Sequence, residues 1–331
     1  MKRHVNIPLF IPHEGCPHAC VFCDQRAIAS KSSAVGRDVT AKIERTLATV
    51  GDGVPVEIAF FGGSFTALEP SVMEGLLKQA YPFVRDGRVD GIRLSTRPDA
   101  IDGDVLALLK AYGVTAIELG VQSLDDAVLT ASGRGHTAYD SLRACALIKD
   151  AGFVLGGQMM IGLPQSTPES ETMTAKGLCG AQIDEARIYP TAVLAGTALA
   201  DMTARGDYVP LSFDEALARS TDVYEIFLSH GVTVLRIGLQ ASETLQAQTL
   251  AGGMPEAFGE YVEGEHYRRL IAEHLAQNAP CGGVLGVRCA RGEASKVAGH
   301  GGRNKKALAG LVKAIRITED ERVKKHELLF S

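Results

Sequence analysis

The chain has 331 residues, of which 46% are hydrophobic, so it is long enough for one large α/β domain with a sizeable core and a small appendage. Its formal net charge of −5 at pH 7 argues against a protein coated with positive charge for nucleic acid, and it leaves a local basic patch open. Seven cysteines, three of them in one short segment, favour a reducing compartment over a disulfide scaffold. No apolar run reaches the length of a signal or membrane-spanning segment, so we expect a soluble cytoplasmic protein that does not bind membranes.

Segments with the apolar or alternating pattern of β-strands recur along the chain, and helical segments separate most of them. The expected strands are 5–11, 54–61, 92–98, 117–123, 154–163, 185–189 and 232–239. The expected helices are 37–50, 69–84, 102–112, a helix-bearing segment that ends at 150, and 214–229. Strand and helix in alternation predict a parallel sheet with right-handed crossovers. We therefore expect an α/β fold: a partial (β/α)6 TIM-type barrel over residues 1–240, open on one side, and a small C-terminal extension over residues 241–331.

Alternation along the strands predicts which polar side chains point into the barrel. They are Ser95 and Arg97 of the third strand, Glu118 and Gln122 of the fourth, Gln158 of the fifth, and Arg187 and Tyr189 of the sixth. Glu118 and Arg187 could pair across the lumen or contact a ligand, and both interpretations stay open. Ligand contact is favoured for Gln122 and Tyr189, which lie nearer the carboxyl ends of the strands, where such barrels carry out their chemistry.

The segment from Cys16 to Cys23 holds three cysteines, with three and then two residues between them. A loop with this spacing can turn its thiolates onto three irons of one cubane and leave the fourth iron without a protein ligand. Ferredoxin-type clusters use four cysteines for electron transfer, so three cysteines indicate an iron kept open for a ligand that reacts. A structural zinc site would need a fourth ligand, usually from a second paired motif, and none follows although His13 and His18 are near. Three unrelated thiols are the other alternative.

This spacing, with Phe22 directly before the last cysteine, resembles the radical S-adenosylmethionine (radical SAM) superfamily. The resemblance implies a [4Fe-4S] cluster on Cys16, Cys20 and Cys23, whose open iron binds S-adenosylmethionine (SAM). It also implies that one electron cleaves SAM to a 5′-deoxyadenosyl radical. A one-electron donor such as flavodoxin or ferredoxin would supply the electron, and the protein would position a substrate C–H bond.

The run Gly62-Gly63-Ser64 follows the second strand. Two glycines let a ligand approach the bare backbone, although a tight turn alone would also explain them. Beside the cysteine loop, the run resembles the superfamily's Gly-Gly motif, which implies that Gly62, Gly63 and Ser64 hold the SAM amino group. The same resemblance places Phe22 beside the adenine, and packing of the loop onto the barrel is a second, compatible role.

Further motifs resemble the radical SAM domain of the Elongator catalytic subunit, a tRNA wobble-uridine modifier, over about residues 5–240. They are Ser95-Thr-Arg-Pro-Asp99, Gly120-Val-Gln-Ser123, Gly133-Arg-Gly-His-Thr137, Lys149-Asp-Ala-Gly-Phe153, Met159-Met160 with Leu163-Pro164, and Ile188-Tyr-Pro-Thr191 followed by Gly196-Thr197. The runs Gly120-Val-Gln-Ser123 and Gly162-Leu-Pro-Gln-Ser-Thr167 are also similar to oxygen-independent coproporphyrinogen dehydrogenases. This resemblance implies that Gln122, Arg134 and Gln158 contact SAM. Arg134 suits its carboxylate as a charge-assisted partner, and a solvated surface charge is the alternative.

The chain departs from the Elongator subunit in three ways. That subunit spaces its first two cysteines more widely. It carries an acetyltransferase domain after the barrel, and these 331 residues are expected to lack one, so its acetyl chemistry is not inherited with the fold. Its strand-three glutamate is Ser95 here, so one SAM contact is expected to be weaker or remade. A non-catalytic iron–sulfur or haem-binding relative therefore stays open.

The end of the chain is basic. Residues 288–331 contain eleven Lys and Arg against five Asp and Glu, and residues 295–306 are also rich in glycine. The segment could be a phosphate- or RNA-binding patch or a solvated tail surface. Cys281 and Cys289 are interpreted as ordinary thiols.

The sequence thus predicts a radical SAM enzyme that abstracts a substrate hydrogen. RNA is the first substrate class to consider, by the resemblance and the basic tail. A small molecule or tetrapyrrole comes second and a peptide third. A zinc-dependent RNA-binding module is the remaining alternative.

Overall fold

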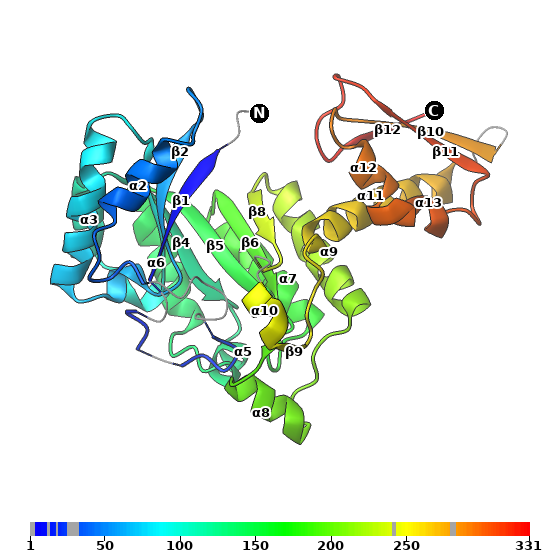
Figure 1. The fold of residues 1–331 in the computed structure, drawn as a ribbon. Helices are drawn as coiled ribbons and strands as arrows, with labels where there is room; N and C mark the ends of the chain where they lie inside the picture. The colour runs from blue at the N-terminus through cyan, green and yellow to red at the C-terminus, as the bar shows by residue number, and fades with distance from the viewer. Residues whose placement is uncertain (1–3, 12–13, 18, 25–32, 240–242, 279–282) are drawn as a thin grey trace.

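The computed structural model describes residues 4–11, 14–17, 19–24, 33–239, 243–278 and 283–331. In these ranges the main body is a curled sheet of seven strands with helices along its outer face (Figure 1). In spatial order the strands are β1 (Val5–Phe10), β2 (Val56–Phe61), β3 (Gly91–Thr96), β4 (Val114–Gln122), β5 (Val154–Ile161), β6 (Glu185–Pro190) and β8 (Thr233–Ile237). All neighbouring pairs are parallel, which confirms the expected α/β half-barrel. The last predicted strand, β8, pairs with β6 and adds a seventh strand to the six-fold barrel in the described ranges.

The helices of the main body begin at local signals in the sequence. They are α2 (Thr40–Leu47), α3 (Pro70–Arg85), α4 (Gly103–Ala111), α5 (Asp126–Ala131), α6 (Ala138–Asp150), α7 (Pro168–Gly180), α8 (Ala198–Arg205) and α9 (Phe213–Ser229), with 3-10 turns at Phe65–Ala67 and Pro98–Ala100. The hydroxyls of Thr137, Thr167 and Ser212 accept hydrogen bonds from the first turns of α6, α7 and α9, which satisfies backbone N–H groups that a helix leaves free. Sequence reasoning did not name α7, although Thr167 followed by Pro168 is a common helix start.

The main core lies between the sheet and these helices. Ile117 and Leu119 of β4 and Ile188 of β6 are 0% exposed and belong to it, as the alternation predicted. Fully burying one such side chain stabilises the fold by about 1.5–3 kcal/mol. Since successive strand residues alternate between faces, burying these residues outward turns the polar residues between them into the lumen.

After β8 the chain first packs against the barrel as α10 (Glu243–Gln248) and β9 (Thr249–Ala251), which pairs with β7 (Val193–Leu194). It then forms a smaller layer that lies to one side of the barrel (Figure 1). This layer comprises the long α11 (Phe258–Gln277), β10 (Val284–Cys289), α12 (Ala294–Ala298), a 3-10 turn at His300–Gly302, α13 (Arg303–Ala307), β11 (Ala314–Glu319) and β12 (Leu328–Phe330). Strands β11, β10 and β12 form a sheet with its own core around Tyr267, Leu285 and Val287. The layer is tied to the barrel through α9, where Arg269 Nη1 lies 2.7 Å from Asp222 Oδ1.

Among the helices in the described ranges, none combines the length and the apolar character needed to cross a membrane.

Candidate site at the carboxyl ends of the strands

The cysteine loop lies against the turn that follows β2. Cys16 Sγ is 3.5 Å from Ser64 Oγ, and the Ser64 backbone N–H donates to the Glu14 carbonyl oxygen over 3.0 Å. A Cβ on Gly63 would come 2.2 Å from that carbonyl oxygen, and a Cβ on Gly15 would come 2.3 Å from the carbonyl oxygen of Ser64. The two backbones approach so closely that only glycine fits at these positions. The structure therefore brings the first cysteine and the predicted glycine run together.

The far end of the loop rests on segments much later in the chain. The Val21 backbone N–H donates to the Ser132 carbonyl oxygen over 3.1 Å, and the Val21 carbonyl oxygen accepts from the Leu199 N–H over 2.8 Å. Arg134 Nη1 donates to Cys20 Sγ over 3.2 Å. Residues after α5 and at the start of α8 thus also hold the loop.

The three thiols of this loop are half-buried and form no disulfide. Burial, and then the neighbouring Cys20 and Cys16, raise the pKa of Cys23 to about 12. The protein alone therefore does not favour a thiolate there, whereas the positive charge of a bound metal would. No group of three His, Cys, Asp or Glu in the described ranges is arranged around a single ion. That finding concerns single-ion sites, since the cysteines of a cubane bind different irons.

His13 and His18, considered as zinc ligands, and Cys281, considered as a thiol, lie outside the described residues.

Gln122 ends β4 in an unusual conformation beside Arg134. Its φ is +67°, which is uncommon for a residue other than glycine. A Cβ on Gly120 would lie 3.1 Å from Gln122 Nε2 and 3.4 Å from Arg134 Nη2, so both side chains cover the same stretch of backbone. Gln122 Oε1 is buried and has no hydrogen-bond partner in the described part of the chain. An unsatisfied buried acceptor costs about 1–3 kcal/mol, and such costs concentrate at functional sites.

Arg134 is only 7% exposed, so the interpretation of this residue as a solvated surface charge is wrong. Its Nη2 donates to the Gly120 carbonyl oxygen over 2.5 Å, and its Nε donates to His136 Nε2 over 3.3 Å. Its own carbonyl oxygen accepts from Arg97 Nη2 over 2.6 Å. Arg134 is therefore held through both its backbone and its side chain.

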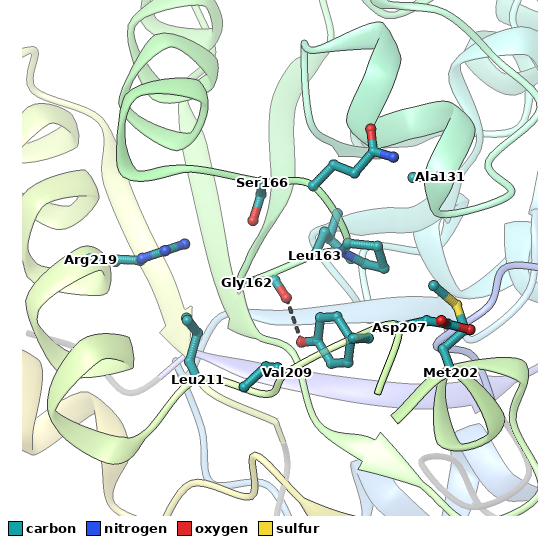
Figure 2. A pocket seen from close by; sticks show the side chains of 12 residues that line it. Ala131, Gly162, Leu163, Ser166, Met202, Asp207, Val209, Leu211 and Arg219 are labelled. Carbon is teal, nitrogen blue, oxygen red and sulfur yellow. Dashed lines mark hydrogen bonds between the residues drawn. The ribbon is translucent and has the colours of Figure 1, made fainter. Parts of the chain in front are cut away.

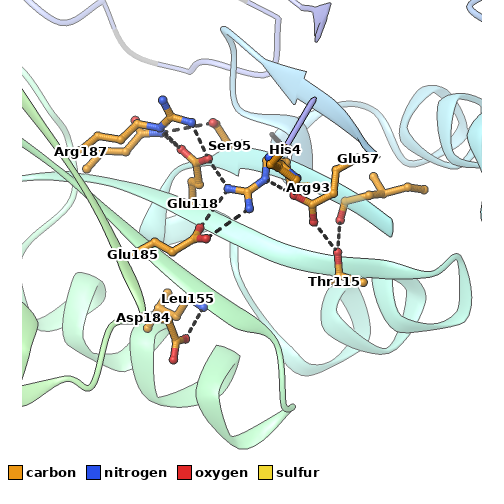
Figure 3. A network of polar contacts seen from close by, with 12 residues as sticks. His4, Glu57, Arg93, Ser95, Thr115, Glu118, Leu155, Asp184, Glu185 and Arg187 are labelled. Atoms are coloured by element: carbon orange, nitrogen blue, oxygen red, sulfur yellow. Dashed lines mark hydrogen bonds and ion pairs between the residues drawn. The ribbon is translucent and has the colours of Figure 1, made fainter. Parts of the chain in front are cut away.

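Glu118 is the centre of an ion-pair network inside the barrel (Figure 3). It is 1% exposed and accepts from Arg187 Nε over 2.6 Å and from Arg93 Nη1 over 2.9 Å. Gln158 Nε2 donates to Glu118 Oε2 over 2.9 Å and to Ser95 Oγ over 3.2 Å. Burial on its own would raise the pKa of Glu118, but the hydrogen bonds and charge of Arg187 prevail and hold it below its usual range. Of the two interpretations left open for Glu118 and Arg187, the structure shows the pairing.

Sequence reasoning missed Arg93, which joins this network to two more strands. Arg93 Nε lies 2.8 Å from Glu57 Oε2 of β2, and Arg93 Nη1 lies 3.0 Å from Glu185 Oε2 of β6. Arg93 has the same strand parity as Ser95, so alternation along β3 could have identified it. The four residues Arg93, Glu118, Glu57 and Glu185 connect β2, β3, β4 and β6 across the lumen.

Two more predicted residues lie near this network or the loop. Tyr189 follows Arg187 on the same face of β6, and burial raises the pKa of Tyr189 although Arg187 opposes the shift. Phe22 packs against a small apolar cluster that includes Val193, Leu199 and Tyr208. The structure thus shows the packing role of Phe22, and its place beside an adenine stays a prediction.

Hollows open at the same rim. One, of about 280 Å³, is lined by the loop that follows β5 and is bordered by Leu163, Arg219 and Tyr208 (Figure 2). Another, of about 120 Å³, lies where β6 and β8 end, between Pro190, Gly238 and Met254. Both belong to the end of the barrel at which the cysteine loop lies.

The basic segment at 295–306 is largely paired within the chain. The contacts are Lys296 with Glu263 at 2.8 Å and with Glu293 at 3.3 Å, His300 with Glu260 at 3.5 Å, and Arg303 with Asp214 at 3.0 Å. Lys305 and Lys306 are exposed. Within residues 295–306, three of the five basic residues therefore face carboxylates of this protein.

Comparison with known protein families gives two matches. The model described as the Radical SAM superfamily matches residues 10–176, and the model described as the Radical_SAM C-terminal domain matches residues 183–268. The first match contains the cysteine loop, the glycine run, Gln122 and Arg134.

Among curated proteins, the chain is 26% identical over 246 residues to a tRNA uridine(34) acetyltransferase of Methanocaldococcus jannaschii, which covers 62% of this chain and 45% of that protein. It is 36% identical over 121 residues to Elongator complex protein 3 of Saccharomyces cerevisiae, which covers 36% of this chain and 22% of that protein. The chain thus spans less than half the length of these two relatives.

Among solved structures, archaeal Elp3 of Methanocaldococcus infernus, with an N-terminal deletion, matches with a TM-score of 0.65 at 21% identity, over 81% of this chain and 64% of that one. Coproporphyrinogen III oxidase of Escherichia coli matches with a TM-score of 0.51 at 20% identity, over 70% of this chain and 54% of that one. These two likenesses concern the fold.

Proposed function

The chain belongs to the radical SAM superfamily, and from this premise we propose that it is an enzyme that holds a [4Fe-4S] cluster on Cys16, Cys20 and Cys23 and cleaves SAM beside it. The observation that carries the proposal is the meeting of three segments at one rim. The cysteine loop contacts Ser64 after β2 and Arg134 after α5, and both contacts are made through cysteine sulfurs.

The residues present fit an anionic cluster. Arg134 is buried, and its guanidinium contacts a thiol, an imidazole and a carbonyl oxygen. No carboxylate contacts it among the residues that the structure describes. A buried cation is costly without a negative partner, and a cluster held by thiolates would provide one. Cys23, whose pKa is raised by burial, would likewise lose its proton on binding iron.

We assign the binding of SAM to residues around the cysteine loop. The resemblance implies this role for Phe22, Gly62, Gly63, Ser64, Gln122, Arg134 and Gln158. Ser95 is included because it stands where the family has a contacting glutamate, and Tyr189 because strand alternation places it near the carboxyl end of its strand. Support comes from Gln122, whose buried Oε1 is free to accept a hydrogen bond from a ligand. Gln158 adds further support, because its Nε2 is fixed by Ser95 and Glu118 and its position in the lumen is therefore defined.

When bound, the cluster supplies one electron, received from a donor such as flavodoxin or ferredoxin, that cleaves SAM and so begins hydrogen abstraction from the substrate. The chain's own residues position the partners. Glu118, Arg93 and Arg187 are ion-paired in the lumen, with side chains that are 1%, 6% and 13% exposed, and so hold the strands that carry Ser95 and Gln158 in place. The two backbones that meet at Gly63 fix the height of the cysteine loop above the sheet.

For the substrate we propose RNA. The support is the tRNA uridine(34) acetyltransferase activity in the names of relatives that match over 59% to 62% of this chain. The basic segment adds little, because Lys296, His300 and Arg303 already face carboxylates. The proposal therefore depends on the relatives rather than on an electrostatic surface.

The test uses the full chain, reconstituted anaerobically with iron and sulfide and reduced with dithionite. We expect iron and sulfide in the ratio of one [4Fe-4S] cluster per chain, release of 5′-deoxyadenosine from SAM, and faster release when bulk tRNA is added. A triple C16A/C20A/C23A variant is the control and should release none. Zinc in place of iron after anaerobic purification would overturn the cluster. A cluster without 5′-deoxyadenosine would indicate a carrier, and stimulation by coproporphyrinogen III but not by tRNA would move the substrate to the small-molecule class.

A further inference from the structure

Arg134 makes contacts that the assignment to the SAM carboxylate does not use. Its Nη1 donates to Cys20 Sγ over 3.2 Å, its Nη2 donates to the Gly120 carbonyl oxygen over 2.5 Å, and its Nε donates to His136 Nε2 over 3.3 Å. These contacts use three different nitrogens of the guanidinium. They fix the plane of the group and direct one N–H at a cluster cysteine.

His136 is suited to hold this arrangement. It is 5% exposed, and burial, together with the charges of Arg134 and Arg97, lowers the pKa of His136 to about 4. The imidazole is therefore neutral near pH 7, and its Nε2 can accept from the Arg134 Nε–H. Nδ1 of His136 has no hydrogen-bond partner within the described ranges, so the contact with Arg134 is the one that orients the ring.

We propose that Arg134 is a positioning residue that donates a hydrogen bond to the sulfur of Cys20 and so raises the reduction potential of the cluster. His136 holds the guanidinium of Arg134 in place. The inference rests on the proposed function, since it needs the cluster. It also assigns a role to His136, a residue of the motif Gly133-Arg-Gly-His-Thr137 to which the resemblance gives no role.

The direction of the effect follows from electrostatics. Reduction adds an electron to an anionic group, so a nearby positive charge and a hydrogen bond to a ligand sulfur both stabilise the reduced form. The effect is strong at low exposure because little water screens it, and Arg134 is 7% exposed. Groups that hydrogen-bond to a metal ligand, as Arg134 does to Cys20, have large effects on metal sites.

The experiment measures the midpoint potential of the reconstituted full chain without SAM, by redox titration monitored by electron paramagnetic resonance. We expect R134Q to shift the potential to more negative values. The matched control is R143Q, because Arg143 is an exposed arginine on α6 that donates to the Ile101 carbonyl oxygen, and it should leave the potential unchanged.

A second pair of variants tests His136 while Arg134 stays in place. H136L removes the acceptor, so we expect a negative shift smaller than that of R134Q. H136Q offers an amide oxygen at a similar reach, so we expect a potential closer to that of the unchanged protein. If R134Q does not take up iron, the potentials of H136L and H136Q still test whether the hydrogen bond from Arg134 raises the reduction potential.

SAM affinity separates this role from carboxylate binding. If R134Q weakens SAM binding and leaves the potential at the R143Q value, Arg134 is a SAM ligand alone and the inference is overturned. Equal potentials in H136L, H136Q and the unchanged protein would overturn the role of His136. If the unchanged protein holds a cluster but cleaves no SAM, the proposed function fails and the potentials still decide the inference. If it holds no cluster, both fail.

Discussion

Gly63 packs against the carbonyl oxygen of Glu14 so closely that a Cβ would lie 2.2 Å from that oxygen. This contact fixes the cysteine loop on the end of β2. Residue 63 tolerates no side chain, because the atoms nearest to a Cβ built there belong to the backbone. The position of Cys16 therefore depends on the absence of a Cβ at residue 63.

We expect G63A to destabilise the protein by about 1–3 kcal/mol, as overpacking does, and to lower its iron content after reconstitution. G75A is the matched control, since Gly75 lies in α3 with nothing within 4 Å of a Cβ built there. In a helix this change should raise stability by about 0.5–1 kcal/mol. Chemical denaturation and iron analysis measure both effects, and a G63A protein with unchanged stability and full iron would contradict the packing argument.

Glu118 should be among the most sensitive positions for stability. E118Q leaves Arg187 and Arg93 buried beside a neutral amide, and breaking a buried pair costs about 3–5 kcal/mol. E44Q is the control, because the Glu44–Arg88 pair is exposed and its loss should change the denaturation midpoint little. Similar midpoints for the two variants would show that the network adds no stability.

The same carboxylate predicts a dependence on pH. The pKa of Glu118 is lower in the folded protein than in the unfolded chain, so the folded state binds its proton less tightly. The stability it contributes is then full above the unfolded value of about 4.3 and is lost as the pH falls through the folded value. We expect the stability difference between the unchanged protein and E118Q to be constant from pH 6 to 8 and to shrink below pH 4. A difference that grows on acidification would refute the sign.

Gln122 predicts opposite effects on stability and binding. Q122M keeps the length of the side chain and removes the buried oxygen that has no partner, so the protein without SAM should be as stable or more stable, by up to about 1 kcal/mol. SAM affinity should fall. Q165M is the control, because Gln165 has a similar φ of +64° but an exposed side chain, and it should change neither property. Calorimetry of SAM binding and thermal unfolding separate the two effects; a loss of stability in Q122M with unchanged affinity would make Gln122 a structural residue.

The basic segment predicts a limited salt effect on RNA binding. Only Lys305 and Lys306 of its five basic residues have no acidic partner in the described part of the chain, so K305A/K306A should reduce the dependence of log K on log salt by about two for a duplex. K296A should instead lower stability, since Glu263 and Glu293 lose their shared cation. An unchanged salt slope in the double variant would remove this segment from the RNA interface.

Alternation along the strands predicted much of the barrel. It placed Glu118 and Arg187 in the lumen and Ile117 and Ile188 outside, because a parallel strand covered by helices turns its apolar residues one way. The same alternation along β3 could have identified Arg93, which points to the same face as Ser95, but sequence reasoning did not name it. The pattern also predicted the last strand at 232–239, but its pairing with β6 is a tertiary property that periodicity does not show.

Local sequence could not predict the close contacts of the site. The need for glycine at 15 and 63 arises where two loops meet, and neither loop shows it alone. The orientation of Arg134 depends on Gly120 of β4 as well as on His136 of its own loop. Thr167 and Pro168, by contrast, marked the start of α7 in the sequence and were overlooked.

The lumen network also constrains how the chain is made. Arg93 and Glu118 leave the ribosome well before Glu185 and Arg187, with which they pair across sequence separations of 92 and 69 residues. A nascent sheet of β1 to β4 would hold Arg93, Glu57 and Glu118 without their later partners. We expect these early strands to remain unfolded during synthesis until β6 has emerged, so that the half-barrel forms in a single late step.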